Sequence, residues 1–483
     1  MRKLLLAATA AATFGGMTGL ASAQAPSPPP GPPPANVVAS GGQPWWGGTF
    51  SAYPSPTPEA GTYQAYFRSR LAFDAGVSND SGNGVNNANK QNPFQFAEYA
   101  RIYPAFVGTL ANGMQYGAYM EVRQNSGGAQ ATGGTGGNTL FWRRQIGYVG
   151  GNWGSVRFGQ GDGVLGYFLT GTLEATWGGS WNGDYPGTYN NAGTSVIWPF
   201  PENSGNYGSL KVVYLTPQWM GFDAGIHFQP SHSTSGGPEC SAAIGSSIST
   251  CNPAISLSSG SFASGAGTWN GRGQLAREVN QIQGAVRWRG NAGPLAIVAS
   301  PGFSVAGNLH DGGTSGTSAS GAPKYQFATP WMMDFGTTVS FGNITFGGTF
   351  MYGAVAPDGS NNTLPKPRGA VNSTNFIVGG QYVIGPYQII ANYLQNNMQG
   401  AWAQDYAGTY NPVTKTQNTF GRSNQWGINI AGGYNYAPGC ELDLTYLYGQ
   451  THQWGYDAIN GAAGLSHNNT HAQGLILTNL FQW

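Results

Sequence analysis

Apolar and polar residues alternate with a period of two along most of the chain from residue 62 to its end. In the segment 63–73 the odd positions are mostly apolar, as at Phe67 and Phe73, whereas the even positions include Arg68 and Arg70. The same alternation recurs in 114–123, 222–229, 343–352 and 425–436. Successive side chains of a strand point to opposite faces of a sheet, so these segments are predicted to be strands with one apolar and one polar face.

The connections between these strands alternate between short and long. Tight turns are predicted near 109–112, 150–153, 216–219, 290–294, 341–343, 385–386 and 437–439. Stretches without a strand pattern cover 76–92, 125–138, 161–206, 230–275, 307–326, 356–372, 399–421 and 452–469. Seven turns and eight loops separate about sixteen strands, which predicts an all-β fold, an antiparallel transmembrane barrel over 61–483 with short periplasmic turns and long external loops. Two strands, 140–150 and 295–305, alternate less regularly than the others.

The first 60 residues do not alternate in this way. Three N-terminal residues with two positive charges, an apolar run from Leu4 to Phe14 and the small residues 21–23 are typical of a secretory signal peptide, 1–23, cleaved before Gln24. Residues 24–60 are rich in proline, which favours a semi-rigid polyproline-II segment that cannot join a sheet. We interpret this segment as a periplasmic spacer or, alternatively, as a tether to peptidoglycan or another periplasmic partner.

The composition is consistent with a membrane barrel. Charged residues make up only 8% of the chain, against roughly 25% in typical soluble proteins. The net charge of +1 gives no reason to expect nucleic-acid binding, and the aromatic content of 13% argues against a disordered chain. No apolar run after the leader reaches the roughly 18 residues that a membrane helix needs. Any membrane span must therefore be built from strands.

The last strand ends on an aromatic residue. Leu475, Leu477, Phe481 and Trp483 share one face of this strand. An aromatic terminus with apolar residues at alternating positions resembles the assembly signal of outer-membrane proteins. We therefore expect these four residues to direct the chain to the barrel-assembly machinery.

The loop 161–206 directly follows the fifth predicted strand and is the third of the external loops. A loop of this length in a compact domain is usually functional or disordered, and we expect this one to fold into the barrel and narrow it. Its only charged residues are four acids, Asp162, Glu174, Asp184 and Glu202. We interpret its aromatic residues, Trp177, Trp181 and Tyr185, as a wedge against the barrel wall or, alternatively, as a surface that stacks on a sugar ring.

Basic residues gather on the polar faces of the first six strands. They are Arg68, Arg70, Arg101, Arg123, Arg157 and Lys211, with Arg143 or Arg144 as a further candidate. A basic side chain on the lipid face would cost about 2–4 kcal/mol at the membrane midplane, so these residues are expected to face the lumen. There they would oppose the loop acids, and rings of charge set selectivity in pores. Alternatively, they pair with carboxylates of neighbouring strands, such as Asp74 and Glu121, and only stiffen the wall.

The sequence has no nucleophile elbow, P-loop or dinucleotide fingerprint, so it favours a conduit over an enzyme, and no cofactor is expected. A plugged structural or adhesive barrel is a third possibility. His467 and His471 lie four residues apart at an expected loop end, and we expect no metal site there. Cys240 and Cys251 share one external loop and could form a disulfide after export, which would leave Cys440 unpaired.

Three stretches resemble the corresponding strands of Gram-negative general porins. They are 97–103 (AEYARIY), 151–159 (GNWGSVRFG) and 210–222 (LKVVYLTPQWMGF). The resemblance covers roughly residues 61–483. It implies a homotrimer of water-filled outer-membrane channels, each with the loop after the fifth strand folded inward.

This resemblance implies passive diffusion of small hydrophilic solutes and ions. The alternative is a substrate-selective outer-membrane channel for a sugar or a dicarboxylate. The expected surroundings are outer-membrane lipid and lipopolysaccharide, and no nucleic-acid partner is expected.

Overall fold

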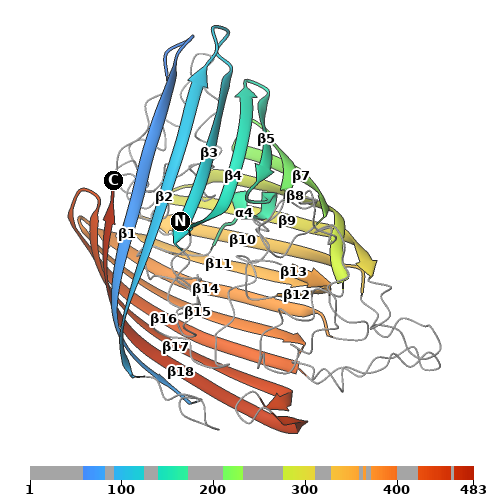
Figure 1. Cartoon of the computed structure of the whole chain (residues 1–483), viewed down its shortest axis with the longest axis vertical. Coiled ribbons are helices and arrows are strands. Elements are labelled where there is room, and N and C mark those ends of the chain that lie inside the picture. Colours follow the sequence, from blue (N-terminus) through green and yellow to red (C-terminus); the bar gives the residue numbers. More distant parts are fainter. Residues whose placement is uncertain are drawn as a thin grey trace, which may run out of the picture.

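The chain forms a closed antiparallel barrel of sixteen strands. The computed structural model describes residues 58–81, 92–124, 140–171, 210–231, 276–310, 328–357, 363–365, 371–399, 422–457 and 462–483. Within these ranges the strands follow one another around the ring in chain order, and β1 closes the ring against β18 (Figure 1). The predicted all-β barrel of about sixteen strands is confirmed.

The barrel strands differ widely in length, from six residues in β6 to 21 in β18. They are β1 (Tyr63–Asp80), β2 (Phe94–Thr109), β3 (Gln115–Gln124), β4 (Leu140–Gly151), β5 (Gly154–Gln160), β6 (Leu210–Leu215), β7 (Phe222–Ser231), β8 (Ala276–Ala292), β9 (Leu295–His310), β10 (Trp331–Phe341), β11 (Ile344–Gly353), β14 (Ser373–Ile384), β15 (Tyr387–Gln399), β16 (Arg422–Ala437), β17 (Cys440–Asp457) and β18 (Ala462–Gln482). A short helix, α4 (Val164–Tyr167), follows β5, and β12 (Val355–Pro357) pairs with β13 (Thr363–Pro365) as a separate small sheet.

The two faces of the wall differ as the alternation predicts. Large apolar side chains point outward and are exposed, for example Phe67 at 67% and Phe346 at 62%. Their neighbours in the same strands, such as Arg68 and Thr345, are buried on the inner face. A continuous apolar outer surface with polar residues inside is the pattern of a barrel that stands in lipid.

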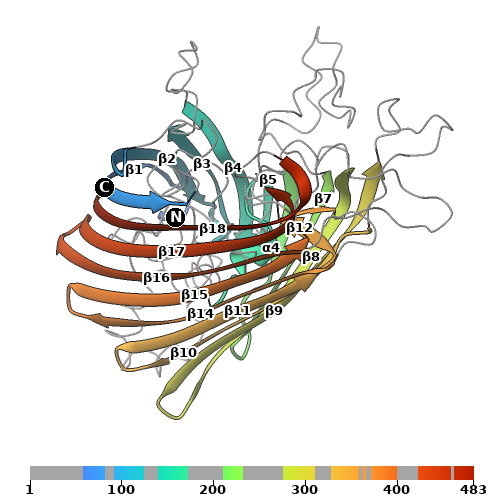
Figure 2. The ribbon, with the colours of Figure 1, turned by 90° about the horizontal axis from the view of Figure 1, so that it is seen from below.

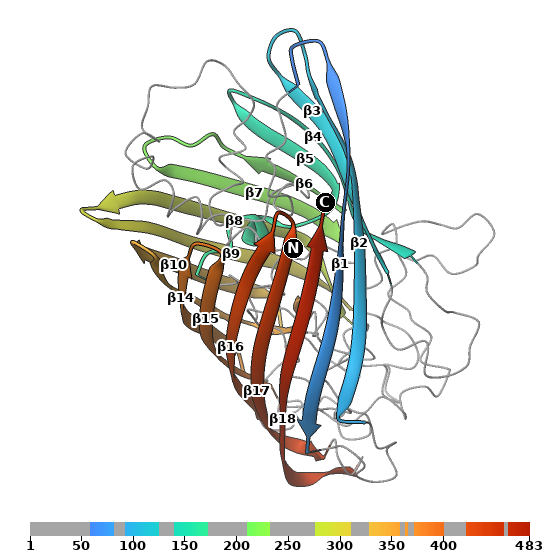
Figure 3. The same ribbon diagram turned by 90° about the vertical axis from the view of Figure 1, so that its left-hand side faces the viewer.

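The first and last strands meet in one long seam, visible where β18 lies beside β1 in Figure 3. The register pairs Asp74 with Thr478, and the Thr478 hydroxyl donates a hydrogen bond to the Asp74 carboxylate (2.6 Å). The seam ends with two backbone hydrogen bonds between Ser69 and Trp483. The last residue of the chain therefore takes part in closing the ring.

A bulge explains the irregular alternation of one predicted strand, 140–150. In the β3–β4 pair, Glu121 lies opposite Arg144 while Val122 lies opposite Trp142, so one extra residue is inserted in β4. A second irregularity, between Val279 and Ile282, inserts its extra residue in β8 and so does not account for the weak alternation of 295–305 in β9. An inserted residue reverses the inside–outside phase of the strand that carries it, which breaks a strict period of two.

Two predicted loops are shorter or more ordered than expected. The stretch 452–469 was expected to be loop, but β17 extends to Asp457 and β18 starts at Ala462. Backbone pairing between β17 and β18 continues through most of this hairpin. The two strands therefore extend through it although apolar and polar residues alternate only weakly there. The stretch 356–372 contains the β12–β13 pair.

Several sequence predictions lie outside the described residues. They are the signal peptide, most of the proline-rich segment, and Cys240 and Cys251. Cys440 is described and forms no disulfide. None of the described helices is long and apolar enough to cross a membrane.

Candidate functional site

The chain turns into the barrel directly after β5. Residues 161–171 are all buried, and α4 lies inside the ring of strands, close to β7 and β8 (Figure 2). The segment supplies its own apolar residues, with Val164, Leu165 and Phe168 packed in one cluster with wall residues such as Ile146 and Leu215. Glycines at 161, 163 and 166 interrupt the apolar run and let its backbone lie close to the wall. The predicted inward fold is confirmed for this described part of the loop.

Side chains of the wall bind the amide groups at the start of α4. The Val164 N–H donates to Nδ1 of His227 on β7 (3.0 Å), and the Leu165 N–H donates to Oε1 of Gln283 on β8 (3.2 Å). These amides have no partner within the helix, so the wall satisfies them. Because Nδ1 of His227 accepts, the imidazole is neutral and carries its proton on Nε2, which lies 3.4 Å from Gln281.

Other wall side chains bind the carbonyl groups of the same loop. Lys211 on β6 donates to the carbonyl oxygen of Gly161 (2.6 Å), and Ser300 on β9 donates to that of Phe168 (2.8 Å). Thr349 on β11 donates to the carbonyl oxygen of Thr170. The loop thus runs along the inner face from β5 to β11, held by successive strands.

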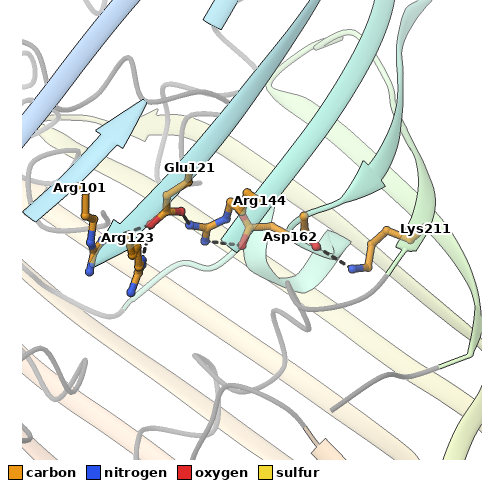
Figure 4. A network of polar contacts seen from close by, with 7 residues as sticks. Arg101, Glu121, Arg123, Arg144, Asp162 and Lys211 are labelled. Atoms are coloured by element: carbon orange, nitrogen blue, oxygen red, sulfur yellow. Dashed lines mark hydrogen bonds and ion pairs between the residues drawn. The ribbon is translucent and has the colours of Figure 1, made fainter. Parts of the chain in front are cut away.

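A network of charges connects the loop to the first strands, as Figure 4 shows. Arg144 on β4 contacts both Glu121 on β3 and, at 2.7 Å, Asp162 at the start of the loop. Glu121 also contacts Arg123 and, at 3.7 Å, Arg101 on β2. One buried carboxylate is therefore shared by three guanidinium groups.

The register places three arginines side by side on the inner wall. Arg70 on β1 lies directly opposite Arg101 on β2, and Arg101 lies directly opposite Arg123 on β3. Like charges in directly opposite positions destabilise a strand pair. This arginine row (Arg70, Arg101 and Arg123) is thus an arrangement that strand pairing alone does not favour.

All six basic residues singled out in the sequence lie on the inner face and are buried, namely Arg68, Arg70, Arg101, Arg123, Arg157 and Lys211. Arg157 stacks on the ring of Tyr167 in α4, 4.5 Å from its centroid, so it also contacts the loop. Between the two candidates on β4, Arg144 is the one that faces inward. Glu121 pairs with wall arginines, as the alternative role predicts, and Asp162 connects the loop to Arg144; the role of the cations in selectivity stays a prediction.

A second buried charge cluster was not singled out from the sequence. Arg287 on β8 binds Asp223 on β7 through two nitrogen atoms, at 3.2 and 2.7 Å, and Arg289 approaches the same carboxylate at 3.3 Å. The Arg287 guanidinium lies over the ring of Phe168 in the loop, 4.7 Å from its centroid. The alternation in 222–229 already predicted that Asp223 faces inward. Its partner Arg287 on β8 could be identified only from the strand register.

The other loop residues predicted to act in the constriction lie outside the described residues. They are Glu174, Asp184 and Glu202, together with Trp177, Trp181 and Tyr185. At the C-terminus, Leu475, Leu477, Phe481 and Trp483 lie on the outer face and are 37–60% exposed. Within the described part of the chain, no group of three or more His, Cys, Asp or Glu side chains could hold a metal ion.

Comparison with known proteins places this architecture among outer-membrane channels. A sequence model of the family described as Gram-negative porin matches residues 7–453. A search of curated proteins gives no match.

Solved structures of outer-membrane proteins are similar to this chain at low sequence identity. The anion-selective porin from Comamonas acidovorans is 13% identical, with 87% of this chain and 100% of that chain covered and a TM-score of 0.50. The outer-membrane channel DcaP of Acinetobacter baumannii is 12% identical, with 89% and 99% covered and a TM-score of 0.47. OmpF of Salmonella typhi, solved with daunomycin, is 10% identical, with 87% and 97% covered and a TM-score of 0.46.

Proposed function

Because the chain belongs to the Gram-negative porin family, we propose that it is a general diffusion channel of the outer membrane, narrowed by the loop 161–206. Small hydrophilic solutes and ions pass through its interior without energy input. The observation that carries this proposal is the inward path of residues 161–171 along the wall of a closed sixteen-strand barrel. A barrel of this size encloses an aqueous channel, and the loop takes up part of its cross-section.

Selectivity follows from the charges beside the loop. The arginine row, Arg157 and Lys211 present cations to the interior, while Glu121 and Asp162 supply carboxylates at the junction with the loop. Glu121 and Asp162 lie on the same side of the passage as the arginines that they bind, so cations outnumber carboxylates on this wall. Such an excess of fixed charge sets the ion selectivity of a pore.

The surroundings of the channel follow from the same proposal. The chain is exported with cleavage of 1–23, assembled by the barrel-assembly machinery through its C-terminal residues, and surrounded by lipid and lipopolysaccharide. It forms a homotrimer and has no enzymatic activity. The proline-rich segment remains on the periplasmic side as a spacer or as a tether to peptidoglycan. Migration of unheated and heated protein on a denaturing gel tests the trimer, which should dissociate only on heating.

Replacing Arg101 and Arg157 by alanine tests the role of the wall cations. In planar bilayers the wild-type chain should give stepwise conductance, and the double variant should show a lower permeability of chloride relative to potassium. The physical reason is that two fixed positive charges have been removed from the passage. The reversal potential in a gradient of potassium chloride measures this ratio.

The outcomes separate the parts of this proposal. An absence of conductance steps in the wild-type chain would contradict the channel itself. Normal steps with an unchanged reversal potential in the double variant would remove these two arginines from the selectivity mechanism. Arg289→Ala, a third inward-facing arginine outside the arginine row, shows whether any loss of positive charge has the same effect.

A further inference from the structure

The inner wall of β14–β16 has a chemistry different from that of β1–β8. From 373 to 383, from 388 to 396 and from 425 to 433, the inward-facing positions carry no ionisable side chain. Amides take their place, and seven of them are buried, namely Asn375, Gln381, Gln388, Asn392, Asn396, Gln425 and Asn429. We call this surface the amide face.

The strand register arranges these amides in rows across the wall. Asn375 on β14 lies opposite Asn396 on β15, which lies opposite Gln425 on β16. Four residues further along β15, Asn392 lies opposite Asn429. Directly opposite residues in a sheet are about 4.5–5.5 Å apart, so each row is a continuous line of amide groups.

Two amide oxygens in the first row have no hydrogen bond among the described residues. Asn375 and Asn396 are 0% and 1% exposed, and Oδ1 of each accepts no hydrogen bond. Their nitrogen atoms are in use, because Asn375 donates to the carbonyl oxygen of Gln395 and Asn396 donates to Oε1 of Gln425, each at 3.3 Å. The large majority of buried side-chain polar atoms in proteins have a hydrogen-bond partner, so two adjacent acceptors without one indicate a missing donor.

An apolar row separates the two lines of amides. Ile377 lies opposite Leu394, and both are fully buried, while Gly427 on the next strand adds no side chain. The space that a side chain at Gly379 would take is filled by the amide of Asn392, which lies opposite. The amide face thus consists of two lines of amide donors and acceptors with an aliphatic strip between them.

We propose that the amide face binds neutral, polyhydroxylated solutes as they pass through the barrel. Hydroxyl groups supply the hydrogens that Asn375 and Asn396 lack, and the aliphatic strip of Ile377 and Leu394 contacts the C–H face of the same ring. Glu441 of β17 accepts a hydrogen bond from Gln388, eight positions from Asn396 along β15. The row of Asn375, Asn396 and Gln425 itself carries no charge, which favours a neutral ligand there. This inference rests on the proposed channel function and deepens it, because it assigns a solute class to one side of the lumen.

Current block by maltotriose in planar bilayers tests the proposal. Maltotriose should block the potassium chloride current of the full-length wild-type channel saturably, whereas polyethylene glycol of similar mass should not, because its chain has no hydroxyl groups along its length. In the double variant Asn375→Leu/Asn396→Leu, which keeps the side-chain size, the half-blocking concentration should rise roughly ten-fold, as expected for the loss of one to two hydrogen bonds.

A matched control is Asn397→Leu, the same change at the neighbouring, outward-facing position of β15. It should leave both conductance and block unchanged. Normal conductance without saturable block, or equal block by polyethylene glycol, would overturn the amide-face proposal while leaving the channel function intact. If the double variant does not fold, the maltotriose–polyethylene glycol comparison on the wild-type chain still decides the question.

Discussion

At the scale of single residues, Glu121 is the centre of the charged wall. Its carboxylate is fully buried and is shared by Arg101, Arg123 and Arg144. Buried charges are stable only when they are paired, and loss of one partner leaves the others uncompensated. The acid therefore keeps three neighbouring cations in place, including two of the arginine row.

Glu121→Gln should destabilise the barrel by about 3–5 kcal/mol, because three buried guanidinium groups lose their shared counter-charge. The temperature at which the folded barrel changes its gel mobility should fall. The same change at Glu98, which lies on the outer face, serves as the control and should have little effect. Equal losses in the two variants would show that Glu121 has no special role in the wall.

The sequence predicted the inward direction of these side chains but not their partners. Alternation in 63–73 and 114–123 placed Arg70, Glu121 and Arg123 on the inner face. It did not show that Arg70 and Arg101 are direct neighbours, because this depends on the register of β1 and β2. Arg143 and Arg144 could not be distinguished because the bulge in β4 changes the phase next to them.

At the scale of elements, the loop after β5 has little regular structure of its own. The single turn of α4 contains only four residues, and most of the loop's described hydrogen bonds come from side chains of β4, β6, β7, β8, β9 and β11. The wall therefore determines the path of the loop. Its length and position were predictable from the strand pattern, but its path was not, because the wall residues lie 18 to 179 positions away in the sequence.

Gly336 on β10 lies directly against the backbone of the loop. A Cβ atom at this position would overlap the carbonyl oxygen of Thr170, whereas a Cβ at Gly432 would meet nothing nearer than 3.9 Å. Gly336→Val should therefore displace the loop from the wall and change the single-channel conductance. Gly432→Val should keep the wild-type value.

These two glycine variants decide how the passage is narrowed. Identical conductance in Gly336→Val and the wild type would mean that the position of residues 168–171 does not limit the flow of ions. A change in both variants would mean that valine disturbs the strands themselves.

At the scale of the whole molecule, the outer surface carries aromatic residues near both ends of the strands. Tyr387, Tyr434 and Tyr436 cluster near the short turns, and Trp426 packs with Tyr393 and Tyr448 near the opposite end. Such bands lie at the two membrane interfaces of outer-membrane barrels. The sixteen-strand architecture was predictable because the strand pattern and the alternation of short and long connections recur many times along the chain. The wrong loop prediction at 452–469 therefore did not change the predicted number of strands.

The seam makes the C-terminus a structural element. Trp483 is bonded through its backbone to Ser69, and its ring is exposed on the outer face. Deleting Phe481–Trp483 should reduce the amount of heat-modifiable barrel in the outer membrane several-fold, because the closing hydrogen bonds and the proposed assembly signal are both lost. Trp483→Phe keeps an aromatic terminus and should assemble normally. Normal assembly of the deletion would contradict a role for these residues.

The positions of the wall residues that bind the loop also bear on the order in which the barrel folds. Every side chain that binds residues 161–171 through the hydrogen bonds described above lies between Arg144 and Thr349, within the arc of the ring from β4 to β11. The seam, in contrast, joins strands from the two ends of the chain, and such distant contacts form late because they close the longest loop. The loop can therefore dock on a curved, still open sheet. The barrel need not pass through a stage in which it is closed but unobstructed.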